Sequence, residues 1–318
     1  MNNNNVKANN EVGKKDNFSN YKKVFWNRKR IFSWNMVTPA FVSLLLLAIG
    51  PLLFVFYNAF RRWNLTVPVP PKFIGFGNFL KLFHDTRFWN AFGNTTILMV
   101  AGIIIQIILG LGIAMLLKER FKGRNIVTGL MLIPVLIAPV VGAVSWKFLF
   151  NDLYGLINYW LSFIGIDGPL WVSSSRFWGL FSILIADTWQ WTPFVALVLL
   201  AGLEGIPKEI YEASDVDGAS NVRVFFKLTI PLLKPMFTLI ILLRTIFIFK
   251  IFDKVITLTE GGPGVSTESM SLLTYYMGMK RYAIGYTMSM AVIQIIFMVI
   301  VANIFLKITT DKKNLEAR

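Results

Sequence analysis

The sequence contains no cysteine and only one histidine in 318 residues. The lack of cysteine excludes disulfide scaffolds, thiol catalysis, iron–sulfur clusters and zinc sites with cysteine ligands. The single histidine, His84, leaves little material for a histidine-based metal site or a catalytic triad. We therefore expect neither catalytic residues nor metal ligands on this chain.

Charge is also scarce, because Asp, Glu, Lys and Arg make up 15% of the chain, against about 25% in soluble domains. The 32 Lys and Arg outnumber the 17 Asp and Glu, which gives a net charge of +15. A soluble nucleic-acid-binding domain would carry such charge on a polar surface, whereas 55% of this chain is hydrophobic. The composition excludes nucleic acid as a partner and indicates a membrane protein.

Apolar stretches long enough to cross a bilayer, about 20 residues each, occur six times. They lie at residues 34–60, 94–117, 126–150, 177–203, 230–257 and 283–306. The first is longer than the apolar core of a signal peptide and is followed by no small-residue cleavage pattern. The predicted fold class is an all-α membrane protein with six transmembrane helices.

The distribution of Lys and Arg predicts the orientation of these spans. With the N-terminus inside, the cytoplasmic segments 1–33, 118–125, 204–229 and 307–318 hold 19 basic residues and the external loops hold 8. Both termini are therefore predicted to be cytoplasmic. A disordered basic tail over 1–33 would contact anionic membrane lipid, or alternatively dock a partner. A transmembrane domain is expected over 34–308, followed by a second tail over 309–318.

The longest predicted cytoplasmic connection, residues 204–229, carries signals for two short helices. Pro207 suits a first helical turn, and Gly218 suits the end of that helix. Either Asp217 or Ser220 could cap the second helix. The pattern predicts a helix–turn–helix along the inner membrane face, with an acidic tip toward the cytoplasm.

This connection resembles the EAA loop of bacterial ABC-importer permeases. The family pattern is Glu-Ala-Ala, three residues, Gly, nine residues and Ile-x-Leu-Pro, and the chain keeps its spacing from Glu212 to Pro231. It departs from the pattern only at Ser214, Leu228 and Ile230. Two further stretches, 133–158 and 252–263, are similar to the first permease of maltose-type systems, and the likeness covers about 34–308.

The resemblance implies a permease subunit that imports an oligosaccharide delivered by an extracytoplasmic solute-binding protein. Its other implied partners are a second, related permease and two ATPase subunits, which carry the ATP and Mg²⁺. This chain would then be no enzyme, hold no cofactor and lie in a bacterial inner membrane. The coupling helix would fit a groove of the ATPase and link ATP hydrolysis to alternating access. The implied coupling residues are Tyr211, Glu212, Ala213, Ser214, Asp217 and Gly218.

Charges inside the predicted spans are candidates for the substrate pathway, because they are costly in a bilayer. In span four, Asp187 is followed by Trp189 and Trp191, and Asp187 shares a helix face with Trp191. Aromatic planes beside an acid suit a sugar, whose apolar faces stack on rings. The alternative is that the tryptophans pack between helices and Asp187 pairs with a lysine.

Span five carries Arg244, Lys250, Asp253 and Lys254, and on one helix the last three would share a face near its outer end. One interpretation is a Lys–Asp pair that closes a helix interface. The other is that surplus positive charge attracts an acidic, uronate-containing oligosaccharide.

Two other function classes are possible alternatives from the sequence. An integral-membrane enzyme of lipid-linked sugar metabolism would need acid pairs or a metal-binding acidic cluster, and the acidic cluster here falls within the EAA pattern. An ion-coupled secondary transporter would show internally repeated halves, and no convincing repeat is present.

Overall fold

The computed structural model describes residues 36–119 and 121–316. The predicted tail over 1–33 lies outside the described residues. The chain divides into two units, Met1–Tyr57 and Asn58–Arg318. The described part of the first unit belongs to the helix Met36–Ala59, whose apolar side chains are mostly exposed.

Four helices are long and apolar enough to cross a membrane: Met36–Ala59, α3 (Thr86–Lys118), α8 (Arg176–Glu204) and the part Ile284–Phe305 of α15 (Ile284–Glu316). Two more candidates are bent helix pairs, Arg124–Leu136 with Pro139–Leu149 and Asn221–Leu232 with Lys234–Phe249. The bends are 94° and 59°. The chain is therefore mostly helical, with four spans by this criterion and up to six if each bent pair counts as one.

The spans predicted over 126–150 and 230–257 are not formed by single continuous helices. In the first, Ile137 and Ala138 both have a ψ of 133°, and for Ala138 this is the extended conformation that the following Pro139 favours. In the second, the helix ends at Phe249, and a new helix begins at Asp253. Apolar composition predicted roughly where these stretches lie but not their breaks.

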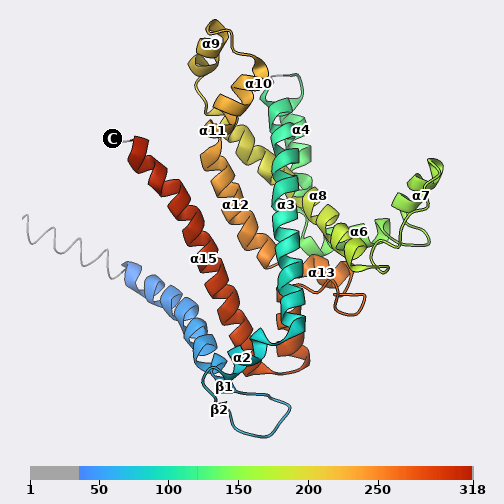
Figure 1. Ribbon diagram of the computed structural model, residues 1–318, viewed down its shortest axis with the longest axis vertical. Helices are drawn as coiled ribbons and strands as arrows, with labels where there is room; N and C mark the ends of the chain where they lie inside the picture. Colours follow the sequence, from blue (N-terminus) through green and yellow to red (C-terminus); the bar gives the residue numbers. More distant parts are fainter. Residues whose placement is uncertain (1–35, 120, 317–318) are drawn as a thin grey trace, which may run out of the picture. The chain divides into compact units, whose positions relative to one another are not determined.

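Shorter elements form the bent pairs and the connections, and most of them are labelled in Figure 1. β1 (Arg61–Arg62) pairs antiparallel with β2 (Lys72–Phe73), with Arg61 opposite Phe73. The remaining elements are α2 (Gly77–Phe83), α4 (Arg124–Met131), α5 (Ile133–Leu136), α6 (Pro139–Leu149), α7 (Leu156–Phe163), α9 (Lys208–Val216), α10 (Asn221–Val224), the π-helix η1 (Phe225–Thr229), α11 (Ile230–Leu232), α12 (Lys234–Phe249), α13 (Asp253–Leu258), α14 (Met270–Tyr275) and the π-helix η2 (Tyr276–Lys280).

Within the second unit, α3 and α8 lie side by side and form the centre of the packing (Figure 1). A Cβ atom on Gly110 of α3 would lie 2.7 Å from Cγ1 of Val195 on α8, so only glycine allows this approach. Ile183, Ile248 and Val255 continue the buried cluster toward α12 and α13. These four helices therefore share one core, which fixes the positions of the polar groups between them.

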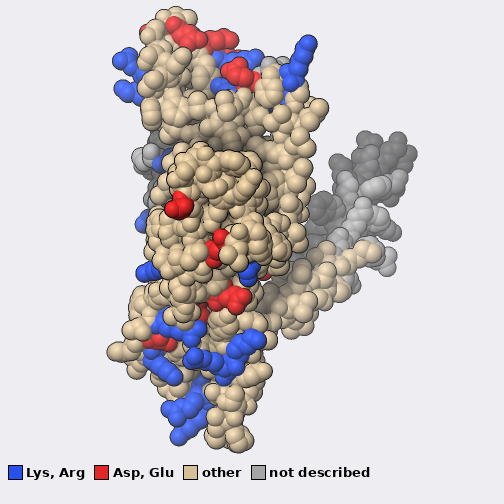
Figure 2. Space-filling model, turned by 90° about the vertical axis from the view of Figure 1, so that its right-hand side faces the viewer, with Lys and Arg blue, Asp and Glu red and all other residues tan. Residues whose placement is uncertain are grey.

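Charged side chains are unevenly spread over the second unit. Figure 2 shows acidic and basic side chains at the end where Figure 1 places α9, a band without Lys, Arg, Asp or Glu next to that end, and further charged side chains from mid-height to the opposite end. Such a band matches a bilayer core, where charged groups are costly.

Candidate functional site

Helix α9 forms where the EAA-like pattern predicted a helix, and local signals set its ends. It begins at Lys208, directly after Pro207, and Glu209 lies in its first turn. Its end is followed by Gly218 with a φ of 67°, the left-handed conformation that glycine adopts without strain. Of the two predicted caps for the next helix, Ser220 takes the role by accepting a hydrogen bond from the Arg223 amide at 3.4 Å.

The predicted coupling residues divide between the two sides of α9. Two of them face the rest of the chain: Ser214 is buried and donates to the Tyr211 carbonyl at 2.7 Å, while the Tyr211 hydroxyl lies 3.3 Å from Thr229 Oγ1 of η1. The other four are exposed, namely Glu212, Ala213, Asp217 and Gly218. Tyr211 and Ser214 attach α9 to the chain, and the four exposed residues are open to a partner.

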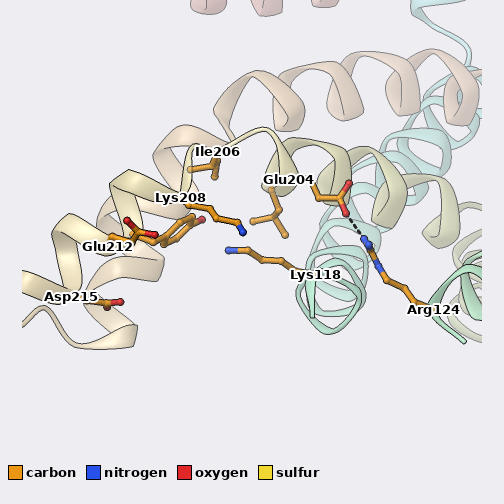
Figure 3. A pocket seen from close by; sticks show the side chains of 9 residues that line it. Lys118, Arg124, Glu204, Ile206, Lys208, Glu212 and Asp215 are labelled. Carbon is orange, nitrogen blue, oxygen red and sulfur yellow. Dashed lines mark hydrogen bonds and ion pairs between the residues drawn. The ribbon is translucent and has the colours of Figure 1, made fainter. Parts of the chain in front are cut away.

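A cleft of about 590 Å³ lies between α9 and the ends of α3 and α8 (Figure 3). Its lining residues are Lys118, Arg124, Leu203, Glu204, Ile206, Lys208, Tyr211, Glu212 and Asp215. Lys118 Nζ lies 3.9 Å above the centre of the Tyr211 ring, and Arg124 forms an ion pair with Glu204. In the sequence, Lys118 and Arg124 counted only among the basic residues of segment 118–125, because the ring and the acid that they contact lie 80 or more residues away.

A second polar site is buried between α3, α8, α12 and α13. Asp187 is its centre: one carboxylate oxygen accepts from Lys254 Nζ at 2.6 Å, and the other accepts from Arg244 and, at 2.9 Å, from Gln106 Nε2. Arg244 Nε also donates to Gln106 Oε1 at 2.7 Å. The exposed fractions are 0% for Arg244 and 5% for both Asp187 and Lys254. We call these four residues the buried charge cluster.

The buried charge cluster matches the pairing of Asp187 with a lysine that the sequence left open, and it adds two residues. Gln106 gave no signal beyond being polar within an apolar span, and Arg244 was known only as an intramembrane charge. Further hydrogen bonds help to offset the cost of burying an ion pair, and Gln106 supplies two of them here, while Arg244 Nη1 has no hydrogen-bond partner.

A cavity of about 210 Å³ adjoins this cluster. Five of the six predicted pathway residues line it, namely Asp187, Trp191, Lys250, Asp253 and Lys254, together with Arg244 and Phe247. Trp191 stacks on Phe247 with ring centres 5.1 Å apart, and the Arg244 guanidinium lies 4.8 Å from the Trp191 ring. Trp189 is absent from the lining and packs against Trp146 instead.

The prediction that Lys250 and Lys254 share a helix face is wrong. α12 ends at Phe249, and Lys250 lies in the break before α13. As a result, Lys250 is exposed at the cavity, while Lys254 points into the buried charge cluster. Among the described residues, no group of three His, Cys, Asp or Glu side chains could hold a metal ion.

Comparison with known proteins identifies the family. The model for "Binding-protein-dependent transport system inner membrane component" matches residues 106–312. The trehalose/maltose transport system permease protein MalF of Thermococcus litoralis is 37% identical over 265 residues, which cover 82% of this chain and 88% of that protein. The sulfoquinovosyl glycerol transport system permease protein SmoG of Agrobacterium fabrum is 31% identical, with 89% and 92% covered.

The fold is similar to that of chains in two solved ABC transporter structures. A chain from the crystal structure of a bacterial ABC transporter that imports the acidic polysaccharide alginate superimposes with a TM-score of 0.75. It is 23% identical, and the match covers 90% of this chain and 99% of that one. A second alginate transporter structure, in complex with a pentasaccharide-bound periplasmic protein, gives a TM-score of 0.74 at 20% identity, with 87% and 93% covered. As the sequence predicted, the chain belongs to the binding-protein-dependent transport system inner membrane component family and is a multi-pass permease of the ABC sugar-transporter type.

Proposed function

We propose that this chain is one permease of an ABC importer that moves an oligosaccharide into the bacterial cytoplasm. It lies in the inner membrane with six spans, each bent pair counting as one, and with both termini in the cytoplasm. A second, related permease completes the pathway, and an extracytoplasmic binding protein delivers the cargo. Two ATPase subunits hold ATP and Mg²⁺, hydrolyse the ATP and drive alternating access. This chain itself holds no cofactor and performs no catalysis.

The way in which α9 is held carries this proposal. Tyr211 attaches the helix to Lys118 of α3 and Thr229 of η1, so a push on α9 is transmitted to two membrane helices. Glu212, at the cleft, and Asp217, outside it, are both exposed, and the ATPase would bind there. An exposed acidic helix that contacts α3 and η1 through Tyr211 suits the transfer of motion between subunits.

Reconstitution with both permeases, the ATPases and the binding protein in proteoliposomes tests this function. We expect oligosaccharide uptake that requires both ATP and the binding protein. Glu212→Lys should lower uptake about tenfold, which corresponds to the loss of about 1.4 kcal/mol of contact with the ATPase. Uptake that runs on an ion gradient without ATP would contradict the proposal and favour a secondary transporter.

For the cargo, we propose an oligosaccharide with an acidic, uronate-like sugar. The cavity beside Trp191 is lined by Arg244, Lys250 and Lys254 against Asp187 and Asp253, which leaves one surplus positive charge. Its volume of 210 Å³ is below the range of about 300–1,000 Å³ for whole small-molecule ligands, so it suits one sugar unit. Lys250 is the exposed cation of this lining, and Trp191 offers a ring for the sugar face.

The cargo's charge is tested by comparing the uptake of acidic and neutral oligosaccharides of equal length. Lys250→Gln should lower the acidic-to-neutral uptake ratio about fivefold, and Lys250→Arg should keep it, because the charge is preserved. Lys280→Gln, an exposed lysine outside the cavity, is the matched control. An unchanged acidic-to-neutral uptake ratio in Lys250→Gln would contradict the proposal of an acidic cargo. It would not contradict the proposed importer function.

A further inference from the structure

The cleft beside α9 contains two lysines that converge on one point. Lys118 ends α3, and Lys208 begins α9. Figure 3 shows their ammonium groups pointing toward one another across the cleft. Like charges in such an arrangement repel each other, and the repulsion is relieved when an anion lies between them.

Neither ammonium group has an acidic partner within the described residues. Lys118 lies over the face of the Tyr211 ring, which leaves its N–H donors without a carboxylate, and Lys208 takes part in no ion pair. Glu204 is already paired with Arg124. The carboxylates of Glu212 and Asp215 lie farther along α9, away from the point of convergence (Figure 3).

We propose that this cleft receives an acidic side chain of the partner ATPase, held between Lys118 and Lys208. One carboxylate has two oxygens and could accept a charge-assisted hydrogen bond from each ammonium group. The cleft, at about 590 Å³, is large enough for a side chain to enter beside the Tyr211 ring. This inference rests on the proposed function. The ATPase would contact the exposed residues of α9 and, in addition, the two lysines inside the cleft.

The charges around the cleft favour a protein carboxylate over a lipid headgroup. α9 carries Glu209, Glu212 and Asp215 and is followed by Asp217. This acidic surface repels an anionic bilayer, which attracts basic segments instead. A single acidic side chain on a protein surface can reach the two lysines without bringing a sheet of negative charge against α9.

The test uses the detergent-purified complex of all subunits and measures how much ATPase stays bound as the salt concentration rises. We expect the double variant Lys118→Gln/Lys208→Gln to retain about fivefold less ATPase than the unmodified complex at low salt, with a weaker dependence on salt. Lys118→Arg/Lys208→Arg keeps both charges and should retain it. Lys122→Gln is the matched control, since Lys122 is exposed in the same connection and does not line the cleft.

Retention of the second permease shows whether the double variant is folded. Equal retention of ATPase by the double variant and Lys122→Gln at every salt concentration would overturn the inference. A loss that disappears when anionic lipid is left out would also overturn it, because the occupant would then be a headgroup. An unmodified complex that never holds ATPase would instead count against the proposed function itself.

A second measurement does not depend on charge. The chain has no cysteine, so Lys118→Cys introduces the sole thiol on it. Paired with cysteine at each acidic surface position of the ATPase in turn, it should form a disulfide at one position under mild oxidation. The absence of any such cross-link in a complex that retains its ATPase would contradict the proposed docking.

Discussion

The buried charge cluster and the cleft beside α9 use the same side-chain types in opposite ways. In the cluster, Asp187 meets Arg244 and Lys254, and all three are at most 5% exposed. In the cleft, Lys118, Lys208 and Glu204 are exposed, and the two lysines have no acidic partner among the described residues. A buried charge needs an oppositely charged or hydrogen-bonding partner within the chain, whereas an exposed charge is solvated by water and can pair with another molecule. The first region therefore fixes the helices, and the second is open to a partner.

Asp187→Asn should give the largest effect on stability. The substitution keeps the volume of the side chain but leaves Arg244 and Lys254 without a counter-charge. Breaking a buried ion pair in this way costs about 3–5 kcal/mol. Thermal unfolding in detergent, followed by tryptophan fluorescence, measures the loss. Asp167→Asn, at an exposed aspartate, is the control, and equal stability of the two variants would remove the distinction between the regions.

Gly110→Val should have the next largest effect, because α3 carries residues of both regions. The added side chain meets Val195 of α8, and overpacking of this kind costs about 1–3 kcal/mol. Gly112→Val is a close control on the same helix, since a Cβ atom there has no neighbour within 4 Å. If both variants unfold at the same temperature, the close approach of α3 to α8 does not stabilise the helices that carry the two regions.

Glu204→Gln should give the smallest effect, although it also breaks an ion pair. The side chains of Arg124 and Glu204 are 21% and 50% exposed, and exposed pairs contribute about 0–1 kcal/mol. The free energy of unfolding should therefore fall by less than about 1 kcal/mol, and the difference should shrink in high salt. A loss as large as that of Asp187→Asn would show that burial does not separate the two regions.

The sequence alone determined those features that depend on neighbouring residues. Apolar length predicted where the spans lie, since membrane burial sums over consecutive residues. Pro207 and Gly218 predicted the ends of α9, because a proline and a left-handed glycine act on the backbone around them. The spacing of the EAA-like pattern predicted the family, which the comparisons confirm.

Tertiary structure decided which polar groups meet. Lys254 lies 67 residues from Asp187, and Gln106 lies 81 residues from it, so no local pattern could connect them. The break after Phe249 separates Lys250 from Lys254. As a result, Lys250 is exposed at the cavity, and Lys254 takes part in the buried charge cluster. A charged residue in an apolar span must find a partner, but the packing of the helices determines which partner it finds.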